Sequence, residues 1–316
     1  MWRTIPCVAS INIMGKYRIY ILAAAFLWGS IGVFFKELSA RGAEPIQIVI
    51  MRTAIAMIGL GVWLLFTDRK KLRIKIKDIW CFIGTGMVSL LFFNWCLFNA
   101  IEEVGIAVAG VLLYTAPAIV TVLSSLLFKE KLKLPYWGVL AIILLGCTLV
   151  TGIVGSTSGI NIPGILYGLG SGFGYALFSI FGRYALRRDY SPQTISFYTF
   201  AFCALASIPF ICLPFIFAFS GATLPIMAAD PSVWVLALAL GTLGSLFPYL
   251  LYTKGLSGVT GATASMTATL EPVVAALFGV ILYKEILTLW QIAGMALVLG
   301  GILLLSKNKT GELQAS

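Results

Sequence analysis

Apolar runs of about 20 residues recur along the whole chain, and they limit its fold more than any other feature. Ten occur in the 316 residues, at 17–36, 46–67, 79–101, 104–127, 135–153, 163–183, 193–219, 233–253, 259–282 and 289–306. A helix of ~20 residues crosses the ~30 Å hydrocarbon core of a bilayer. Because backbone polar groups cannot stay unpaired in lipid, such runs must be helical. The sequence therefore predicts an all-α integral membrane protein with ten transmembrane helices.

The composition excludes an ordinary soluble domain. Hydrophobic residues make up 60% of the chain and charged residues only 11%, whereas soluble domains have ~45–50% and ~25%. The net charge of +10 comes from basic residues in short loops, so it indicates membrane topology and not a nucleic-acid groove. The first dozen residues are too weakly apolar for a signal peptide, and Met14 is an alternative start.

The lysines and arginines are distributed unequally between the loops. With the N-terminus inside, 18 of the 22 basic residues are cytoplasmic, three are external and Arg52 lies within a span. Six of the 18 lie between Arg69 and Lys77, whereas the polar loop 220–232 has none and is expected outside. Since short cytoplasmic loops carry an excess of Lys and Arg, the sequence predicts a multi-pass protein of the cell membrane with both termini cytoplasmic.

The two halves of the chain share a pattern of residues. At an offset of 147, the matches are Phe26 with Phe173, Trp28 with Tyr175, Lys36 with Arg183 and Pro45 with Pro192. At an offset of 155, they are Pro117 with Pro272, Lys129-Glu130 with Lys284-Glu285 and Gly146 with Gly301. The pattern predicts two repeats, 17–153 and 163–306. Each holds five spans, so the second enters the membrane in the opposite direction. Inverted repeats of this kind are common in secondary transporters.

The repeat resembles a known family. Its features are Trp28-Gly29, Arg52, Pro117, the segment Phe128-Lys129-Glu130-Lys131-Leu132 and Gly138, with Pro272, Tyr283-Lys284-Glu285 and Gly294 in the second copy. These residues resemble the EamA domain of the drug/metabolite transporter superfamily, over about 17–306. The resemblance implies ten helices with cytoplasmic termini, and carriers or exporters of amino acids, other metabolites or drugs.

Glu271 is the only acidic residue deep within a predicted span. Burying a carboxylate in a bilayer costs ~2.5 kcal/mol or more, so such residues usually face a cavity or a partner. The next residue, Pro272, removes a backbone donor and predicts a polar kink. Glu271 is therefore predicted to bind substrate or a proton, or to hold a neighbouring helix. The chain has no histidine, so any proton relay must use carboxylates.

Other polar and aromatic residues within the spans are further candidates for a cavity. Arg52 either contacts substrate or acts as a structural anchor, and the resemblance favours the anchor. Tyr114 precedes Pro117 as Glu271 precedes Pro272, so we expect Tyr114 and Glu271 to approach each other near the midplane. The remaining candidates are Asn94 and Trp95 in the third span, Tyr249 in the eighth, and the matched aromatics Trp28 and Tyr175. For each, the alternative is plain interhelical packing.

A secondary transporter is the function class that these features favour. We expect an exporter or exchanger of small metabolites, such as amino acids or related amphipathic solutes, that works by alternating access at a midplane cavity. The sequence shows no catalytic constellation, cofactor fingerprint, metal-type cysteine spacing or nucleotide-binding loop, so we expect no enzyme, cofactor or metal. An intramembrane enzyme or a channel-like facilitator is the alternative. The expected partners are a small-molecule substrate and the lipid bilayer, without nucleic acid, and a homodimer is left open.

Overall fold

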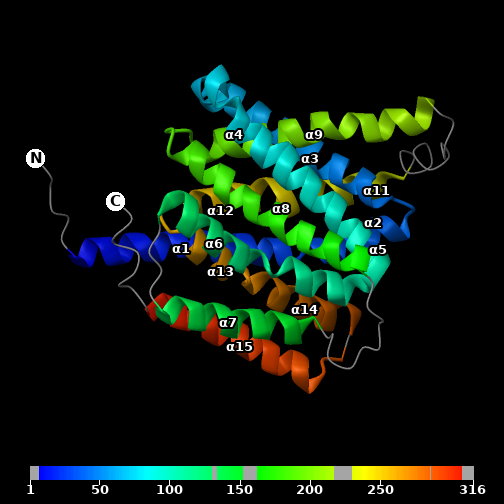
Figure 1. Ribbon diagram of the computed structural model, residues 1–316. Helices are drawn as coiled ribbons and strands as arrows, with labels where there is room; N and C mark the ends of the chain where they lie inside the picture. The colour runs from blue at the N-terminus through cyan, green and yellow to red at the C-terminus, as the bar shows by residue number, and fades with distance from the viewer. Residues whose placement is uncertain (1–6, 130–133, 152–161, 217–229, 285, 308–316) are drawn as a thin grey trace, which may run out of the picture.

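The computed structural model describes residues 7–129, 134–151, 162–216, 230–284 and 286–307, which form a bundle of helices that lie side by side (Figure 1). No strand occurs among these residues, so the predicted all-α class is confirmed for the described part of the chain. The start of α1 and the end of α15 lie at the same end of the bundle, on the left in Figure 1.

The first half of the chain forms eight main helical segments. They are α1 (Cys7–Gly29), α2 (Ile31–Ala40), α3 (Pro45–Thr67), α4 (Ile79–Ile83), the π-helical stretch η3 (Gly84–Leu91), α5 (Phe92–Leu113), α6 (Ala116–Phe128) and α7 (Leu134–Val150). Two short 3-10 turns, η1 (Arg69–Leu72) and η2 (Ile76–Asp78), connect α3 to α4.

The second half follows a similar order. Its segments are α8 (Ile162–Leu186), α9 (Pro192–Ile216), α11 (Pro231–Gly241), the π-helical stretch η4 (Thr242–Leu246), α12 (Phe247–Leu256), α13 (Gly261–Ala268), α14 (Leu270–Tyr283) and α15 (Leu289–Lys307).

Helix starts are set by local chemistry. Pro45 begins α3, where Glu44 and Gln47 form a capping box. Pro231 begins α11, and the side chain of Asp230 caps it by accepting from the amide of Ser232. A proline lacks the amide that the first turn of a helix would leave unpaired, so it is favoured there.

The helices match the predicted spans closely, with differences at some edges. Seven described helices are long and apolar enough to cross a membrane, and two shorter apolar helices cover Pro135–Val150 and Leu289–Leu305. The predicted total of ten is therefore not established by length and composition. The helix α1 begins ten residues before the predicted start at 17. Residues 102–103, which the prediction left between two spans, are helical. The helix is instead interrupted at Gly105, whose φ is 78°. Residues 152–153 and 217–219 of two predicted runs lie outside the described residues.

The same local irregularities recur 155 residues apart in the two halves. The helices α6 and α14 are each followed by a lysine in the left-handed conformation, with φ of 57° at Lys129 and 56° at Lys284. The helices α7 and α15 begin at Leu134 and Leu289, lie side by side and run in opposite directions (Figure 1). The pair approaches closely at Gly146, where an added Cβ would lie 2.9 Å from the carbonyl oxygen of Gly294.

The centre of the bundle is built from helices of both halves. The helix α5 packs along α8, and α1 packs along α12, so each of these pairs joins a first-half helix to a second-half helix. A buried cluster lies where these pairs meet, and it includes Trp28, Phe178, Phe200, Tyr249 and Tyr252. Five buried aromatic side chains of the core therefore lie at the junction of the two halves.

Candidate functional site

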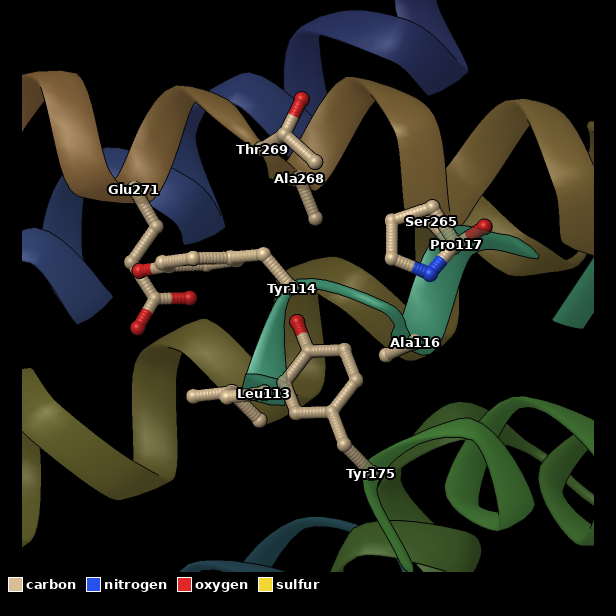
Figure 2. A pocket seen from close by; sticks show the side chains of 9 residues that line it. All are labelled: Leu113, Tyr114, Ala116, Pro117, Tyr175, Ser265, Ala268, Thr269 and Glu271. Carbon is tan, nitrogen blue, oxygen red and sulfur yellow. The ribbon is translucent and has the colours of Figure 1, made fainter. Parts of the chain in front are cut away.

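Two helical rods break next to the same small pocket. The first break, at Tyr114 and Thr115, separates α5 from α6, and Pro117 lies in the first turn of α6. The second, at Thr269, separates α13 from α14. The pocket between them is small, with a cavity volume of about 10 Å³ (Figure 2). Its lining consists of Leu113, Tyr114, Ala116, Pro117, Tyr175, Ser265, Ala268, Thr269 and Glu271.

Glu271 occupies the first turn of α14, at the N-terminal end of that helix. The hydroxyl of Thr269 donates to the carbonyl of Met266 at 2.5 Å, which closes the end of α13 and places Glu271 at the start of a new helix. Figure 2 shows the Tyr114 ring extending toward Glu271, and the two groups interact electrostatically. Among the described residues, no hydrogen bond or ion pair is formed with the Glu271 carboxylate. The predicted polar kink is thus a complete helix break that carries an unpaired acid.

Arg52 is buried beside this site and held by another polar side chain. It is 7% exposed, and its Nη2 donates to Oδ1 of Asn94 at 3.1 Å. Asn94 in turn donates from Nδ2 to the carbonyl of Leu90 at 2.6 Å, which fixes the amide. The Nε of Arg52 is buried without a hydrogen-bond partner in the described part of the chain. Its charge interacts with both Glu271 and Tyr249, although Arg52 lines neither of the two central pockets.

A second pocket adjoins the first and is lined mainly by aromatic rings. Its cavity volume is about 10 Å³, and Tyr175 belongs to the lining of both pockets. The other residues of this lining are Trp28, Ser89, Leu90, Phe93, Phe178, Ser179, Tyr249 and Tyr252. The ring of Trp28 lies 5.3 Å from each of Tyr249 and Tyr252, measured between centroids.

The predicted site residues lie in three different places. Five of them line the central pockets: Glu271, Tyr114, Tyr175, Trp28 and Tyr249. Two more, Arg52 and Asn94, form the buried pair just described. The structure places Trp95 apart from these, since it is 46% exposed and its ring lies 5.4 Å from that of Tyr167 on the outer surface of the bundle.

Sequence reasoning missed three rings of the aromatic pocket, Phe93, Phe178 and Tyr252. Two of them follow a predicted site residue by three positions, Phe178 after Tyr175 and Tyr252 after Tyr249. Residues three apart share one face of a helix, so this spacing was the available signal. The hydroxyls of Tyr252 and Ser179 share a hydrogen bond of 2.7 Å, which joins α12 to α8.

A wider opening lies at one end of the bundle, between the α8–α9 and α12–α13 connections. Its empty volume, including the solvent-open mouth, is about 1160 Å³. The lining includes Arg183, Arg187, Asp189, Tyr190 and Thr260. Both arginines lie over the ring of Phe128, at 5.1 Å for Arg183 and 4.5 Å for Arg187. The two connections that border this opening lie at the end of the bundle where α1 begins and α15 ends (Figure 1).

Known proteins resemble the chain over nearly its whole length. The model of the EamA-like transporter family matches twice, at residues 16–152 and 162–307. The uncharacterized transporter YwfM of Bacillus subtilis is 28% identical over 94% of this chain and 97% of its own length. The pseudopaline exporter CntI of Pseudomonas aeruginosa is 25% identical over 91% of this chain and 95% of its own length. A solved crystal structure that is 17% identical has a TM-score of 0.77 and covers 92% of this chain and 96% of that one, which supports the fold alone.

Proposed function

Because this chain belongs to the EamA-like transporter family, we propose that it is a secondary transporter that exports or exchanges small metabolites such as amino acids or related amphipathic solutes. Family membership supports a transporter over an enzyme. Relatives that align over nine-tenths of the chain are named transporters, and one of them is named an exporter. The wide opening lies at the end of the bundle that the charge distribution predicts to be cytoplasmic, where a solute for export would enter.

The proposed mechanism is alternating access between two inverted five-helix repeats, 17–153 and 163–306, with both termini cytoplasmic. The opposite directions of α7 and α15 support it, as do the irregularities that recur 155 residues apart. In inverted-repeat transporters, substrate sites lie near the midplane at helices that are discontinuous. The breaks at Tyr114 and at Thr269 supply discontinuous helices from both repeats at one pocket.

The observation that carries the proposal is the unpaired carboxylate of Glu271 in that pocket. A charged side chain at the centre of a bilayer costs ~2.5 kcal/mol or more, so an unpaired one is expected to serve the passage of a solute or a proton. Two roles are open to Glu271. It exchanges a proton as the cavity faces each side, or it binds an ammonium group of the substrate.

The two roles are separated by Glu271→Gln, which keeps the shape of the side chain and removes its charge. The solute is first identified as a metabolite that cells release only when they contain the protein, and the purified protein is then reconstituted in liposomes. If Glu271 carries the proton, the variant loses gradient-driven transport and its pH dependence but retains counterflow. If it binds the ammonium group, gradient-driven transport and counterflow fall together, on the order of tenfold or more, which corresponds to 1.4 kcal/mol.

The matched control is Glu37→Gln, because Glu37 pairs with Arg41 at 2.8 Å and its side chain is 41% exposed. We expect this variant to transport like the parent. Equal transport by parent and Glu271→Gln at every pH would refute the assignment of Glu271. Flux of the solute without saturation or counterflow would favour a channel-like facilitator instead.

A further inference from the structure

A cation lies over an aromatic ring at each end of the bundle, and each of these contacts joins the two halves of the chain. The ammonium nitrogen of Lys36 in α2 lies 3.5 Å from the centre of the Tyr283 ring in α14. Cζ of Arg183 in α8 lies 5.1 Å from the centre of the Phe128 ring in α6. Both distances are within the range of a cation–π interaction. Figure 1 shows α2 on the right, whereas α6 ends on the left, where α1 begins.

The two contacts correspond to each other under the repeat. Lys36 matches Arg183 at the offset of 147, and Phe128 matches Tyr283 at the offset of 155. Each ring is the last residue of its helix, and the left-handed lysine that follows it ends the helix in the same way. The same helix end therefore presents a ring to a cation of the other half, once at each end of the bundle. This is the relation that an inverted repeat imposes on a pair of equivalent contacts.

The helices that carry the two rings both begin at the pocket around Glu271. Pro117 lies in the first turn of α6 and Glu271 in the first turn of α14, and both residues line that pocket. From there α6 runs to the end that the charge distribution predicts to be cytoplasmic, and α14 runs to the opposite end. The two helices have 13 and 14 residues. Because a helix moves as a rigid element, a shift at the pocket is transmitted to a ring at each end.

A cation over a ring is suited to a contact that forms and breaks repeatedly. Separating it leaves a cation that water can solvate and an uncharged ring, whereas separating a buried ion pair leaves two charges without partners. At the predicted cytoplasmic end, Arg187 lies over the same Phe128 ring at 4.5 Å, and both Arg183 and Arg187 line the wide opening. The central pockets have cavity volumes of only about 10 Å³ each. A solute therefore reaches them only when the helices at one end move apart.

We propose that these contacts are two latches that close the ends of the solute path in turn. The outer latch is Lys36 with Tyr283, and the inner latch is Arg183 and Arg187 with Phe128. Separation of one latch opens the pocket to that side while the other latch stays closed. This assignment rests on the proposed transport function and adds the residues that control access to its site. Because the two open states compete, weakening one latch increases access from its own side and decreases access from the other.

The test measures access to the pocket from each side with one reporter cysteine. Ser265→Cys changes a small side chain of the pocket lining, in a background without the native cysteines. An impermeant thiol reagent is added to intact cells for access from outside, and to inverted membrane vesicles for access from the cytoplasm. We expect Tyr283→Leu to raise the labelling rate from outside by about threefold or more and to lower the rate from the cytoplasm. Phe128→Leu should change both rates in the opposite directions.

Conservative variants separate a latch from a merely structural contact. Tyr283→Phe and Phe128→Tyr keep the ring, so the reporter should be labelled as in the parent. Lys36→Met removes the cation of the outer latch and should reproduce Tyr283→Leu, which provides a second variant if the first fails to fold. The matched control is Arg41→Gln, which removes a cation that follows the same helix α2 but pairs with Glu37 at 2.8 Å. It should leave both labelling rates unchanged.

Two results would overturn the proposal. One is faster labelling from both sides in Tyr283→Leu and in Phe128→Leu, because general loosening of the bundle has no direction. The other is unchanged labelling in Tyr283→Leu and in Lys36→Met.

Labelling does not require transport, so the outcomes separate this inference from the proposed function. If the rates shift in opposite directions but no metabolite crosses the membrane, the latches stand and the transport function fails. If a metabolite is transported in a Glu271-dependent way but the rates do not shift, the transporter assignment stands and the latches are wrong.

Discussion

Replacing Asp78 is expected to destabilise the protein more than the loss of an exposed ion pair would. Asp78 is 5% exposed and precedes α4, at the end of the bundle where α8 meets α9. Its Oδ1 accepts from Nε of Arg188 at 3.0 Å, and its Oδ2 accepts from the hydroxyl of Tyr190 at 2.8 Å. The same hydroxyl accepts from the amide of Lys75 at 3.0 Å. These contacts tie the first half of the chain to the second.

The size of the destabilisation by Asp78→Asn depends on how exposed the hydrogen-bond partners of Asp78 are. Each hydrogen bond to a charged group contributes ~1.5–3 kcal/mol, and breaking a fully buried pair costs ~3–5 kcal/mol. The side chain of Arg188 is 36% exposed, so solvent screens part of this interaction. We therefore expect Asp78→Asn to lower the free energy of unfolding by about 2–3 kcal/mol, which for a chain of 316 residues corresponds to a fall in melting temperature of about 3–5 °C.

The assay is thermal unfolding of the purified protein in detergent, with Asp68→Asn as the matched control. Asp68 pairs with Lys71 at 3.7 Å and its side chain is 41% exposed, so its loss should change stability by less than ~1 kcal/mol. A double-variant cycle of Asp78→Asn and Arg188→Gln should show the two effects to be non-additive. Equal melting temperatures for Asp78→Asn and Asp68→Asn would refute the reasoning.

Two further predictions concern topology and pH. In a background without the native cysteines, an impermeant thiol reagent added to intact cells should label Ile286→Cys but not Ile76→Cys. The two isoleucines are 94% and 88% exposed, so the opposite pattern would overturn the orientation. Hydrogen bonds from the side chain and amide of Ser232 lower the pKa of Asp230. A lowered pKa stabilises the start of α11 above the unfolded-state pKa, and that stability is lost as the pH falls through the folded value. Amide exchange in the first turn of α11 should therefore speed up in acid relative to its intrinsic rate. Asp230→Asn, which titrates nowhere in this range, should abolish that response; if it does not, Asp230 is not the cause.

The helices were predictable because lipid imposes both their length and their hydrogen bonding. The predicted runs 46–67 and 289–306 differ from α3 and α15 by a single residue at an end. The family followed from short polar motifs at helix ends, and the family match now establishes it. The π-helical stretches η3 and η4 were not predictable, since nothing in their apolar sequences distinguishes them from α-helix.

The candidate site could be predicted only where the chemistry of a single residue is conspicuous in the sequence. Glu271 was conspicuous because a carboxylate in an apolar run is costly. The aromatic pocket was only partly predictable, because a ring in a membrane helix faces lipid or the interior with little change in sequence. Trp28 and Trp95 illustrate this, since one is buried in the core and the other is half exposed. The pair Asp78 and Arg188 lies 110 residues apart in sequence, so only the fold brings it together.

The N-terminal end of α14 offsets only part of the free-energy cost of placing the Glu271 carboxylate within the membrane. The positive end of α14 stabilises a nearby carboxylate by ~0.3–1 kcal/mol, and by up to ~2 kcal/mol when the geometry is partly buried. This is less than the ~2.5 kcal/mol or more that a charge costs at the centre of a bilayer. Arg52 acts on Glu271 without direct contact, so it reduces the deficit without forming an ion pair. Under the proposed function, the remainder is supplied by a proton or by the ammonium group of a solute. Because both neutralise the same carboxylate, they compete for it, and competition at a single alternating site is sufficient to exchange one for the other across the membrane.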